Sequence, residues 1–157
     1  MSTVTLRINV NGGSYEQEVE PRQTLADFLR EDLGLKGVHL SCEHGFCGNC
    51  NVLVNGEVVR SCLMFAIQAQ GRSVETVESL AGRAGELNDL QQAFTDHHAL
   101  QCGFCTPAML LTAQEFLRAN PGETDEWAIR EAISGVICRC TGYQQIVEAI
   151  RSVAARP

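Results

Sequence analysis

The sequence lacks any long apolar run and carries little positive charge. No stretch approaches the roughly 20 apolar residues that a membrane-spanning helix needs. The opening MSTVTLRINV shows neither a secretory signal nor a twin-arginine pattern. Lys and Arg number 12 against 19 Asp and Glu, which gives a net charge of −7 and argues against a nucleic-acid partner. We therefore expect a cytoplasmic protein without a membrane span.

Residue patterns that are typical of catalytic sites are also missing. No Ser–His–Asp or paired-carboxylate arrangement stands out, and no Gly-rich phosphate loop is present, so we predict no catalytic residue in this chain. Cysteine, in contrast, is abundant, with eight in 157 residues. Because disulfides are rare in a reducing cytosol, metal binding is the leading explanation for these cysteines.

The first half of the chain predicts strands and turns. Residues 4–10 alternate apolar and polar side chains and stop at an Asn-Gly-Gly turn, with a return strand over 14–20. A helix over 24–34 follows, capped by its first threonine. A second hairpin spans 52–60 around Asn-Gly, and a last strand lies within 73–80. These elements predict a small α+β sheet.

The second half predicts helices. Apolar residues recur with a helical period in four segments, which should pack as a compact bundle. We expect Thr124 to cap the third helix and Trp127 to lie in the core. The segments are 87–100, 107–119, 125–134 and 142–155.

Four cysteines form a first set in and after the segment CEHGFCGNC. The spacing C-x4-C-x2-C with a distant fourth cysteine is typical of a plant-type [2Fe–2S] site, whereas zinc ligands usually come as two close pairs. Gly45 and Gly48 allow the loop backbone to approach a metal core and direct N–H groups at the sulfurs. We predict iron–sulfur ligation by Cys42, Cys47, Cys50 and Cys62.

The second set comprises Cys102, Cys105, Cys138 and Cys140. A disulfide between the last two would be strained, so both thiols are expected to face a metal. One C-x2-C pair and one C-x-C pair can also build a tetrahedral zinc site, which stays an alternative at this point. Thr106-Pro107 and Thr141 predict helix starts directly after the two pairs. Free N–H groups and the helix dipole would favour thiolates and an anionic cluster there.

Three segments, CEHGFCGNC, ALQCGFCTPAM and VICRCTGYQQIVEAI, resemble in order and spacing the small iron–sulfur subunit of molybdenum hydroxylases. This is the xanthine dehydrogenase, aldehyde oxidoreductase and carbon monoxide dehydrogenase family, and the resemblance covers essentially the whole chain. It implies a plant-ferredoxin-like β-grasp domain over residues 1–78, a linker over 79–88 and a four-helix bundle over 89–157. Each domain would hold one [2Fe–2S] cluster, which favours iron over zinc in the second set.

The resemblance also implies partners. Family members work with a large subunit that carries a molybdopterin, here expected in its cytosine dinucleotide form, and with a medium FAD subunit, as a dimer of heterotrimers. Electrons would pass from molybdenum through the C-terminal cluster and the N-terminal cluster to FAD, while the complex hydroxylates an N-heterocycle or an aldehyde. Gln101 and Cys140 match positions that contact the pterin. The chain would perform no substrate chemistry alone.

Some residues depart from the family pattern or suggest other classes. Asn49 and Asn51 stand where alanine and threonine are common, and we expect them to add hydrogen bonds near the first cluster and shift its potential. A Rieske-type centre with His39 and His44 is disfavoured because four cysteines are already available. A free-standing two-cluster ferredoxin and a zinc-bound interaction module are the alternative classes. A free carrier has no need of a second domain whose cysteines lie beside Gln101, and a zinc module would be colourless.

Overall fold

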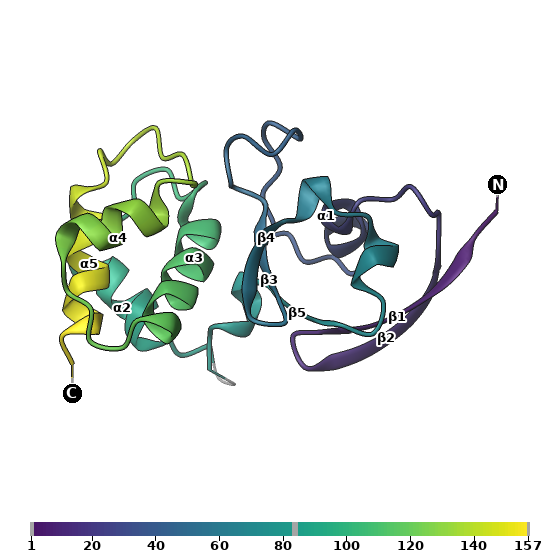
Figure 1. Ribbon diagram of the computed structural model, residues 1–157, viewed down its shortest axis with the longest axis horizontal. Coiled ribbons are helices and arrows are strands. Elements are labelled where there is room, and N and C mark those ends of the chain that lie inside the picture. The colour runs from purple at the N-terminus through teal and green to yellow at the C-terminus, as the bar shows by residue number, and fades with distance from the viewer. Residues whose placement is uncertain (1, 83–84, 157) are drawn as a thin grey trace.

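The chain forms two lobes that lie side by side (Figure 1). The computed structural model describes residues 2–82 and 85–156; Arg83 and Ala84, inside the predicted linker 79–88, lie outside the described residues. The N-terminal lobe contains a mixed sheet and the C-terminal lobe is helical, so the predicted α+β class is confirmed. Among the described residues, no helix combines the length and apolarity that crossing a bilayer requires.

The sheet of the N-terminal lobe is built from two hairpins and a short fifth strand. Each hairpin is antiparallel, and the fifth strand joins them by pairing parallel with one and antiparallel with the other. The order is therefore β2-β1-β5-β3-β4. The strands are β1 (Val4–Val10), β2 (Gly13–Val19), β3 (Asn51–Val54), β4 (Glu57–Arg60) and β5 (Ser73–Glu75).

Both hairpins turn where the sequence predicts. Asn11 and Gly12 have φ values of 52° and 81°, and Asn55 and Gly56 have 53° and 86°. Two successive residues with positive φ match the twist of a tight hairpin, which is why Asn-Gly is favoured there. Short 3₁₀ segments, η2 (Ser61–Leu63), η3 (Ala66–Ala69) and η4 (Val77–Ser79), complete this lobe.

The predicted helix over 24–34 is present only in part. Thr24 caps it as expected, because its hydroxyl accepts the N–H of Asp27 at 3.0 Å. After α1 (Leu25–Asp27) the chain widens into the π-helical segment η1 (Phe28–Asp32), in which the N–H of Leu33 donates to the carbonyl of Phe28, five residues back. The apolar face of both segments is buried against the sheet.

Four helices occupy the described part of the C-terminal lobe: α2 (Asp89–Asp96), α3 (Thr106–Ala119), α4 (Glu126–Ile133) and α5 (Gln144–Ala154). Their apolar faces meet in one core, in which Phe94, Met109, Ile129, Ile146 and Ile150 are almost completely buried. Burying each such side chain contributes about 1.5–3 kcal/mol.

Details at the helix ends correct the sequence-based expectations. Asp125, rather than Thr124, caps α4, because its carboxylate accepts the N–H of Ala128 at 2.9 Å. Thr106 is the first residue of α3 instead of its cap, and Cys105 precedes it. Trp127 is 75% exposed and was wrongly expected in the core. Periodicity locates a helix without telling which of its aromatic residues is covered.

A further correction concerns the start of α5. Thr141, which predicted a helix start, does not cap α5; Tyr143 precedes the helix with a φ of 70°, and no side chain caps it. The hydroxyl of Thr141 instead accepts the N–H of Tyr143 at 3.1 Å.

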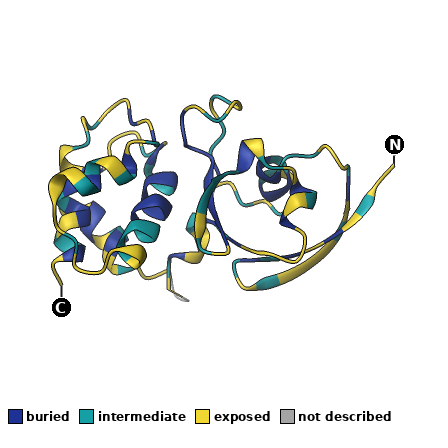
Figure 2. Ribbon diagram, viewed as in Figure 1, coloured by how far each residue is buried: buried dark blue, intermediate teal, exposed yellow. Residues whose placement is uncertain are grey.

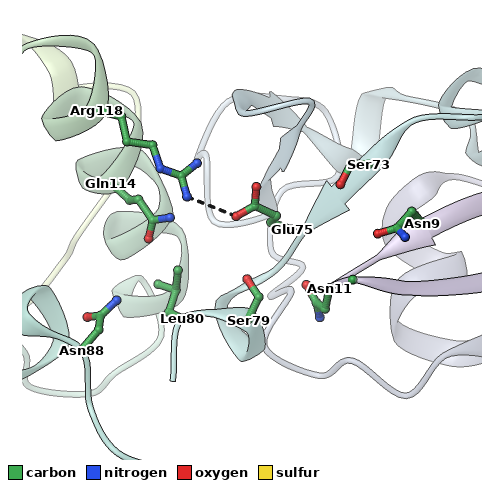
Figure 3. A pocket seen from close by; sticks show the side chains of 10 residues that line it. Asn9, Asn11, Ser73, Glu75, Ser79, Leu80, Asn88, Gln114 and Arg118 are labelled. Atoms are coloured by element: carbon green, nitrogen blue, oxygen red, sulfur yellow. Dashed lines mark hydrogen bonds and ion pairs between the residues drawn. The ribbon is translucent and has the colours of Figure 1, made fainter. Parts of the chain in front are cut away.

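The lobes meet where α3 packs on β3 and β4. Leu53 of β3 belongs to the helical core, and Figure 2 shows buried residues on both sides of this contact. The carboxylate of Glu115 accepts the N–H of Val58 at 2.8 Å. A polar cavity of about 380 Å³ lies at the edge of the junction, and Arg118 in its wall forms an ion pair with Glu75 at 3.4 Å. Figure 3 shows the side chains that line this cavity.

Candidate metal centres

The segments that carry the cysteines gather at one end of the molecule. The loops before β3, before α3 and between α4 and α5 all lie at the upper end in Figure 1. All eight cysteines are free thiols. Within the described residues, no group of three or more His, Cys, Asp or Glu side chains is arranged to hold a single metal ion. The thiols contact one another in pairs instead.

Residues 42–50 form an irregular loop whose backbone turns back repeatedly. Glu43, Gly45 and Gly48 have φ values of 53°, 80° and 71°. These turns direct backbone amides inward: the N–H of Cys47 donates to the sulfur of Cys42 at 3.4 Å. Together with the amides of neighbouring loop residues, this contact lowers the pKa of Cys42 to about 6. The loop therefore favours a thiolate at Cys42.

The other two cysteines of the first set form a buried pair. Cys62 lies in η2, directly after β4, and its side chain hydrogen-bonds with that of Cys50. Burial, and then this contact, raise the pKa of Cys62 to about 11, while the amide of Gly45 acts in the opposite direction. The first set thus consists of the pairs Cys42–Cys47 and Cys50–Cys62.

The second set is assembled from two separate loops. Cys105 immediately precedes α3 and is buried with Cys138. Burial first, and then the hydrogen bond with Cys138, raise the pKa of Cys105 to about 12. Cys102 and Cys140 form a second pair, which is exposed. Their hydrogen bond raises the pKa of Cys140.

Hydroxyl groups fix the loop that carries Cys138. The Thr141 hydroxyl lies 3.1 Å from the Cys138 sulfur, and Tyr143 Oη accepts the Cys138 N–H at 2.9 Å. Tyr143 also donates to the carbonyl of Val136 at 3.3 Å. Burial is the largest single influence and opposes the thiolate of Cys138. The hydroxyl and amide of Thr141, the amide of Cys140 and the contact with Cys105 act together in the opposite direction, and the pKa of Cys138 is lowered.

The two cysteine sets touch through their backbones. The N–H of Ile137 donates to the carbonyl of Cys47 at 2.9 Å. Gly48 lies so close to the second loop that a Cβ there would sit 2.1 Å from the carbonyl oxygen of Gly135. His39 Nδ1 donates to the carbonyl of Phe104 at 2.6 Å, and their rings stack. His39 therefore has a structural contact across the lobes.

Sequence reasoning did not identify Arg60. Its guanidinium donates to the carbonyls of Gly45 and Gly135, each at 2.8 Å, and to the side-chain oxygen of Asn51 at 3.0 Å. The only available signal was a charged residue at the end of a strand, two positions before Cys62. Gln101, which the resemblance marks as a pterin contact, is exposed beside the exposed Cys102.

The residues present fit two [2Fe–2S] clusters. Each set offers four thiols as two pairs, and a [2Fe–2S] cluster is held by four cysteine thiolates on two iron atoms. Backbone amides directed at Cys42 and Cys62 would stabilise the anionic sulfurs. At Gly48, the close approach of the two loops leaves no room for a side chain.

Comparison with protein families gives two matches that together span most of the chain. Residues 8–81 match the 2Fe-2S iron-sulfur cluster binding domain, and residues 76–151 match the [2Fe-2S] binding domain. The two matched regions correspond to the sheet lobe and the helical lobe.

Curated relatives resemble the chain over nearly its whole length. It is 52% identical to the 6-hydroxypseudooxynicotine dehydrogenase complex subunit beta of Paenarthrobacter nicotinovorans, covering 95% of this chain and 92% of the relative. It is 51% identical to the caffeine dehydrogenase subunit gamma of Pseudomonas sp. (strain CBB1), covering 98% and 93%.

A solved structure shows the same fold. A chain of quinoline 2-oxidoreductase from Pseudomonas putida 86 superposes with a TM-score of 0.92 at 48% identity, covering 98% of this chain and 93% of that one. Taken with the two cysteine sets, these matches assign the protein: the chain belongs to the small iron–sulfur subunits of the molybdenum hydroxylases, the family of xanthine dehydrogenase and aldehyde oxidoreductase.

Proposed function

We propose that this chain is the electron-transfer subunit of a molybdenum hydroxylase complex. The observation that carries the proposal is the arrangement of eight free thiols as four contacting pairs in two adjoining sets of loops. Cys42, Cys47, Cys50 and Cys62 would hold one [2Fe–2S] cluster, and Cys102, Cys105, Cys138 and Cys140 the other. When bound, such clusters accept and release single electrons.

The electrons would cross the chain from the helical lobe to the sheet lobe. The exposed pair Cys102–Cys140 makes the second set the side open to a large partner, and Gln101 beside it is free to contact a pterin. On the other side, Phe46 in the first loop is 71% exposed and offers an apolar surface to an acceptor subunit. The hydrogen bond from the Ile137 N–H to the Cys47 carbonyl gives a short route between the two loops, which crosses one hydrogen bond.

The two cluster-holding units would be a β-grasp domain over residues 1–78 and a four-helix bundle over 89–157, joined by a linker over 79–88. The sheet order with one helix packed across it supports the first, and the shared core of α2–α5 supports the second. If the chain is divided in this way, each cysteine set should bind its iron independently of the other.

The complex would contain a large subunit with molybdopterin cytosine dinucleotide and a medium FAD subunit, as a dimer of heterotrimers. Gln101 and Cys140 would contact the pterin. We propose an N-heterocycle as the substrate, ahead of an aldehyde, because the names of the relatives described above refer to nicotine-derived, caffeine and quinoline substrates. A reducing cytoplasm suits eight thiols that are not joined in disulfides.

The test is to tag the chain, purify it anaerobically from its own cells, and measure molybdenum, iron and flavin. We expect about four iron atoms per chain, two for each [2Fe–2S] cluster, with molybdenum and flavin each stoichiometric with the chain. Visible absorbance and acid-labile sulfide would accompany the iron. A colourless protein containing zinc would overturn the proposal.

The free-standing ferredoxin is the alternative that the same experiment separates. Iron and sulfide without molybdenum or a stable partner would favour that carrier. Molybdenum without flavin would keep the hydroxylase and transfer the acceptor role from FAD to another carrier. A Gln101→Ala variant sharpens the partner assignment, because a pterin contact predicts weaker retention of molybdenum in the complex while the iron content stays unchanged.

A further inference from the structure

Arg60, the last residue of β4, lies between the two cysteine loops. Its Nε donates to the carbonyl of Gly45 at 2.8 Å, and its Nη2 donates to the carbonyl of Gly135 at 2.8 Å. Gly45 belongs to the first cysteine loop, and Gly135 lies just before Ile137 and Cys138 of the second. A single half-buried guanidinium therefore binds a backbone acceptor in each loop.

The third contact of Arg60 extends this link into the helical lobe. Its Nη1 donates to Asn51 Oδ1 at 3.0 Å, and Asn51 Nδ2 donates to the Thr112 hydroxyl at 3.0 Å. Thr112 is bonded in turn to the carbonyl of Ala108, one turn earlier in α3. The chain of hydrogen bonds thus runs from the first loop, through β4 and β3, to α3.

Arg60 also leads directly to the fourth cysteine of the first set. Ser61 donates its N–H and its hydroxyl to the carbonyl of Cys50, at 3.4 and 2.6 Å. Cys62 follows at the next position and pairs with Cys50. A displacement of Arg60 would therefore move Cys62 relative to Cys50, and it would also break the contact with the second loop.

Packing around the guanidinium is tight. A Cβ at Gly135 would lie 2.8 Å from Arg60 Nη2, and one at Gly48 would lie 2.1 Å from the carbonyl oxygen of Gly135. Beside these contacts lies the hydrogen bond from Ile137 to Cys47, which joins the two loops at 2.9 Å. The guanidinium thus occupies a site where the backbones are too close for side chains.

We propose that Arg60 is a positioning residue that fixes the separation of the two cysteine loops. Its planar fork reaches three acceptors that lie in different directions, whereas the ammonium of lysine is a single point charge on a flexible stem. The guanidinium also places a positive charge between the two cysteine sets, each of which becomes anionic when it holds a cluster. The inference rests on the proposed function in one respect: the two loops that Arg60 joins are taken to hold the clusters.

The test compares Arg60→Lys and Arg60→Met with wild type in the full chain loaded with iron and sulfide. Hydrogen exchange, followed by mass spectrometry, reports on the peptide that contains Ile137, with the β1–β2 hairpin as the internal reference. We expect exchange at this peptide to accelerate about tenfold in both variants, because each loses charge-assisted hydrogen bonds across the loops. The hairpin should exchange at the wild-type rate.

Arg118→Lys is the matched control, because Arg118 also connects the lobes, through its ion pair with Glu75. Within the described part of the chain, Arg118 forms no hydrogen bond or ion pair with a cysteine loop. An unchanged rate at Ile137 in the Arg60 variants, or equal acceleration in Arg118→Lys, would overturn the proposal. If Arg60→Met does not fold, Arg60→Lys decides, since it keeps the charge and most of the stem.

Magnetic interaction between the two reduced centres gives a second readout. Electron paramagnetic resonance of the reduced wild-type chain should show a splitting that depends on the separation of the two spins. We expect Arg60→Lys to change that splitting and Arg118→Lys to leave it unchanged. A wild-type chain that binds no iron would contradict the proposed function, whereas the exchange measurement would still decide whether Arg60 holds the loops together.

Discussion

The two cysteine sets differ in how the chain builds them. The first set lies on one continuous loop plus η2, and three of its four thiols are buried. The second set joins two loops that are far apart in the sequence, and it has one buried pair and one exposed pair. The first is therefore enclosed by its own loop, while the second depends on the packing of α3, α4 and α5 and opens to the surface.

The donors that face the sulfurs differ in the same way. Backbone amides of the loop approach Cys42, so the donors follow from the loop conformation and survive most changes of side chain. Cys138 is also approached by backbone amides, but in addition by the hydroxyl of Thr141, which a single substitution removes. The second set should therefore be the more easily tuned by mutation, and the first the more sensitive to backbone strain.

Removing one buried cysteine from each set gives the largest expected effect. Cys50→Ala and Cys105→Ala should each lower iron from about four atoms per chain to about two and eliminate one of the two paramagnetic signals. Iron analysis and electron paramagnetic resonance of the purified chain measure this loss. If either variant loses all of its iron, the two sets do not load independently.

Glycine substitutions test the strain in each loop. Gly48 and Gly103 both have positive φ, at 71° and 83°, but a Cβ at Gly103 would meet nothing within 4 Å. Gly103→Ala should cost about 1 kcal/mol from backbone strain alone, which lowers the melting temperature by about 2–4 °C. Gly48→Ala adds a collision with the carbonyl of Gly135 and should lower it by at least about 6 °C.

Calorimetry of the iron-loaded chain measures both melting temperatures. A Gly48→Ala variant as stable as Gly103→Ala would show that the second loop yields easily, and would weaken the inference that the two loops are held at a fixed separation.

Covalent spacing and local turn chemistry explain what could be predicted from the sequence. The motifs C-x4-C-x2-C, C-x2-C and C-x-C and the two Asn-Gly hairpins each depend on residues that are close in the chain, so a pattern identifies them. Arg60 escaped prediction because its partners at Gly45 and Gly135 are backbone carbonyls, which every residue carries, at distant positions. Nothing in a side-chain pattern marks such acceptors.

The predictions of a helix start at Thr141 and of a buried Trp127 were wrong for a related reason. Thr141 carries the right residue type for a cap, but its hydroxyl faces Cys138 and the N–H of Tyr143 instead. Trp127 belongs to a helix whose buried face is formed by Ile129 and Ile133. In both cases the residue type is compatible with two environments, and tertiary packing selects between them.

Asn49 and Asn51, which depart together from the family pattern, should respond differently. Asn51 connects Arg60 to Thr112, so Asn51→Ala leaves two polar groups without their partner and should cost about 2–3 kcal/mol. Asn49 is buried, and its Oδ1 has no hydrogen-bond partner among the residues that the structure describes, so Asn49→Ala should change the stability by less than about 1 kcal/mol. Thermal unfolding separates the two variants, and equal losses would contradict this account.

The smallest expected effect is a change in reduction potential without a change in fold. Thr141 lies 3.1 Å from the Cys138 sulfur, and a hydroxyl that donates to a ligand sulfur stabilises the more negative, reduced state. Thr141→Val removes that donor, and with it the acceptor of the Tyr143 N–H, at almost constant shape. It should lower the potential of the second centre only. Thr141→Ser keeps the hydroxyl and should retain the wild-type potential. A redox titration followed by electron paramagnetic resonance resolves the two centres. If Thr141→Val leaves both potentials unchanged, the hydroxyl donates elsewhere, and the difference in tunability between the two sets would have to come from solvent exposure of Cys102 and Cys140.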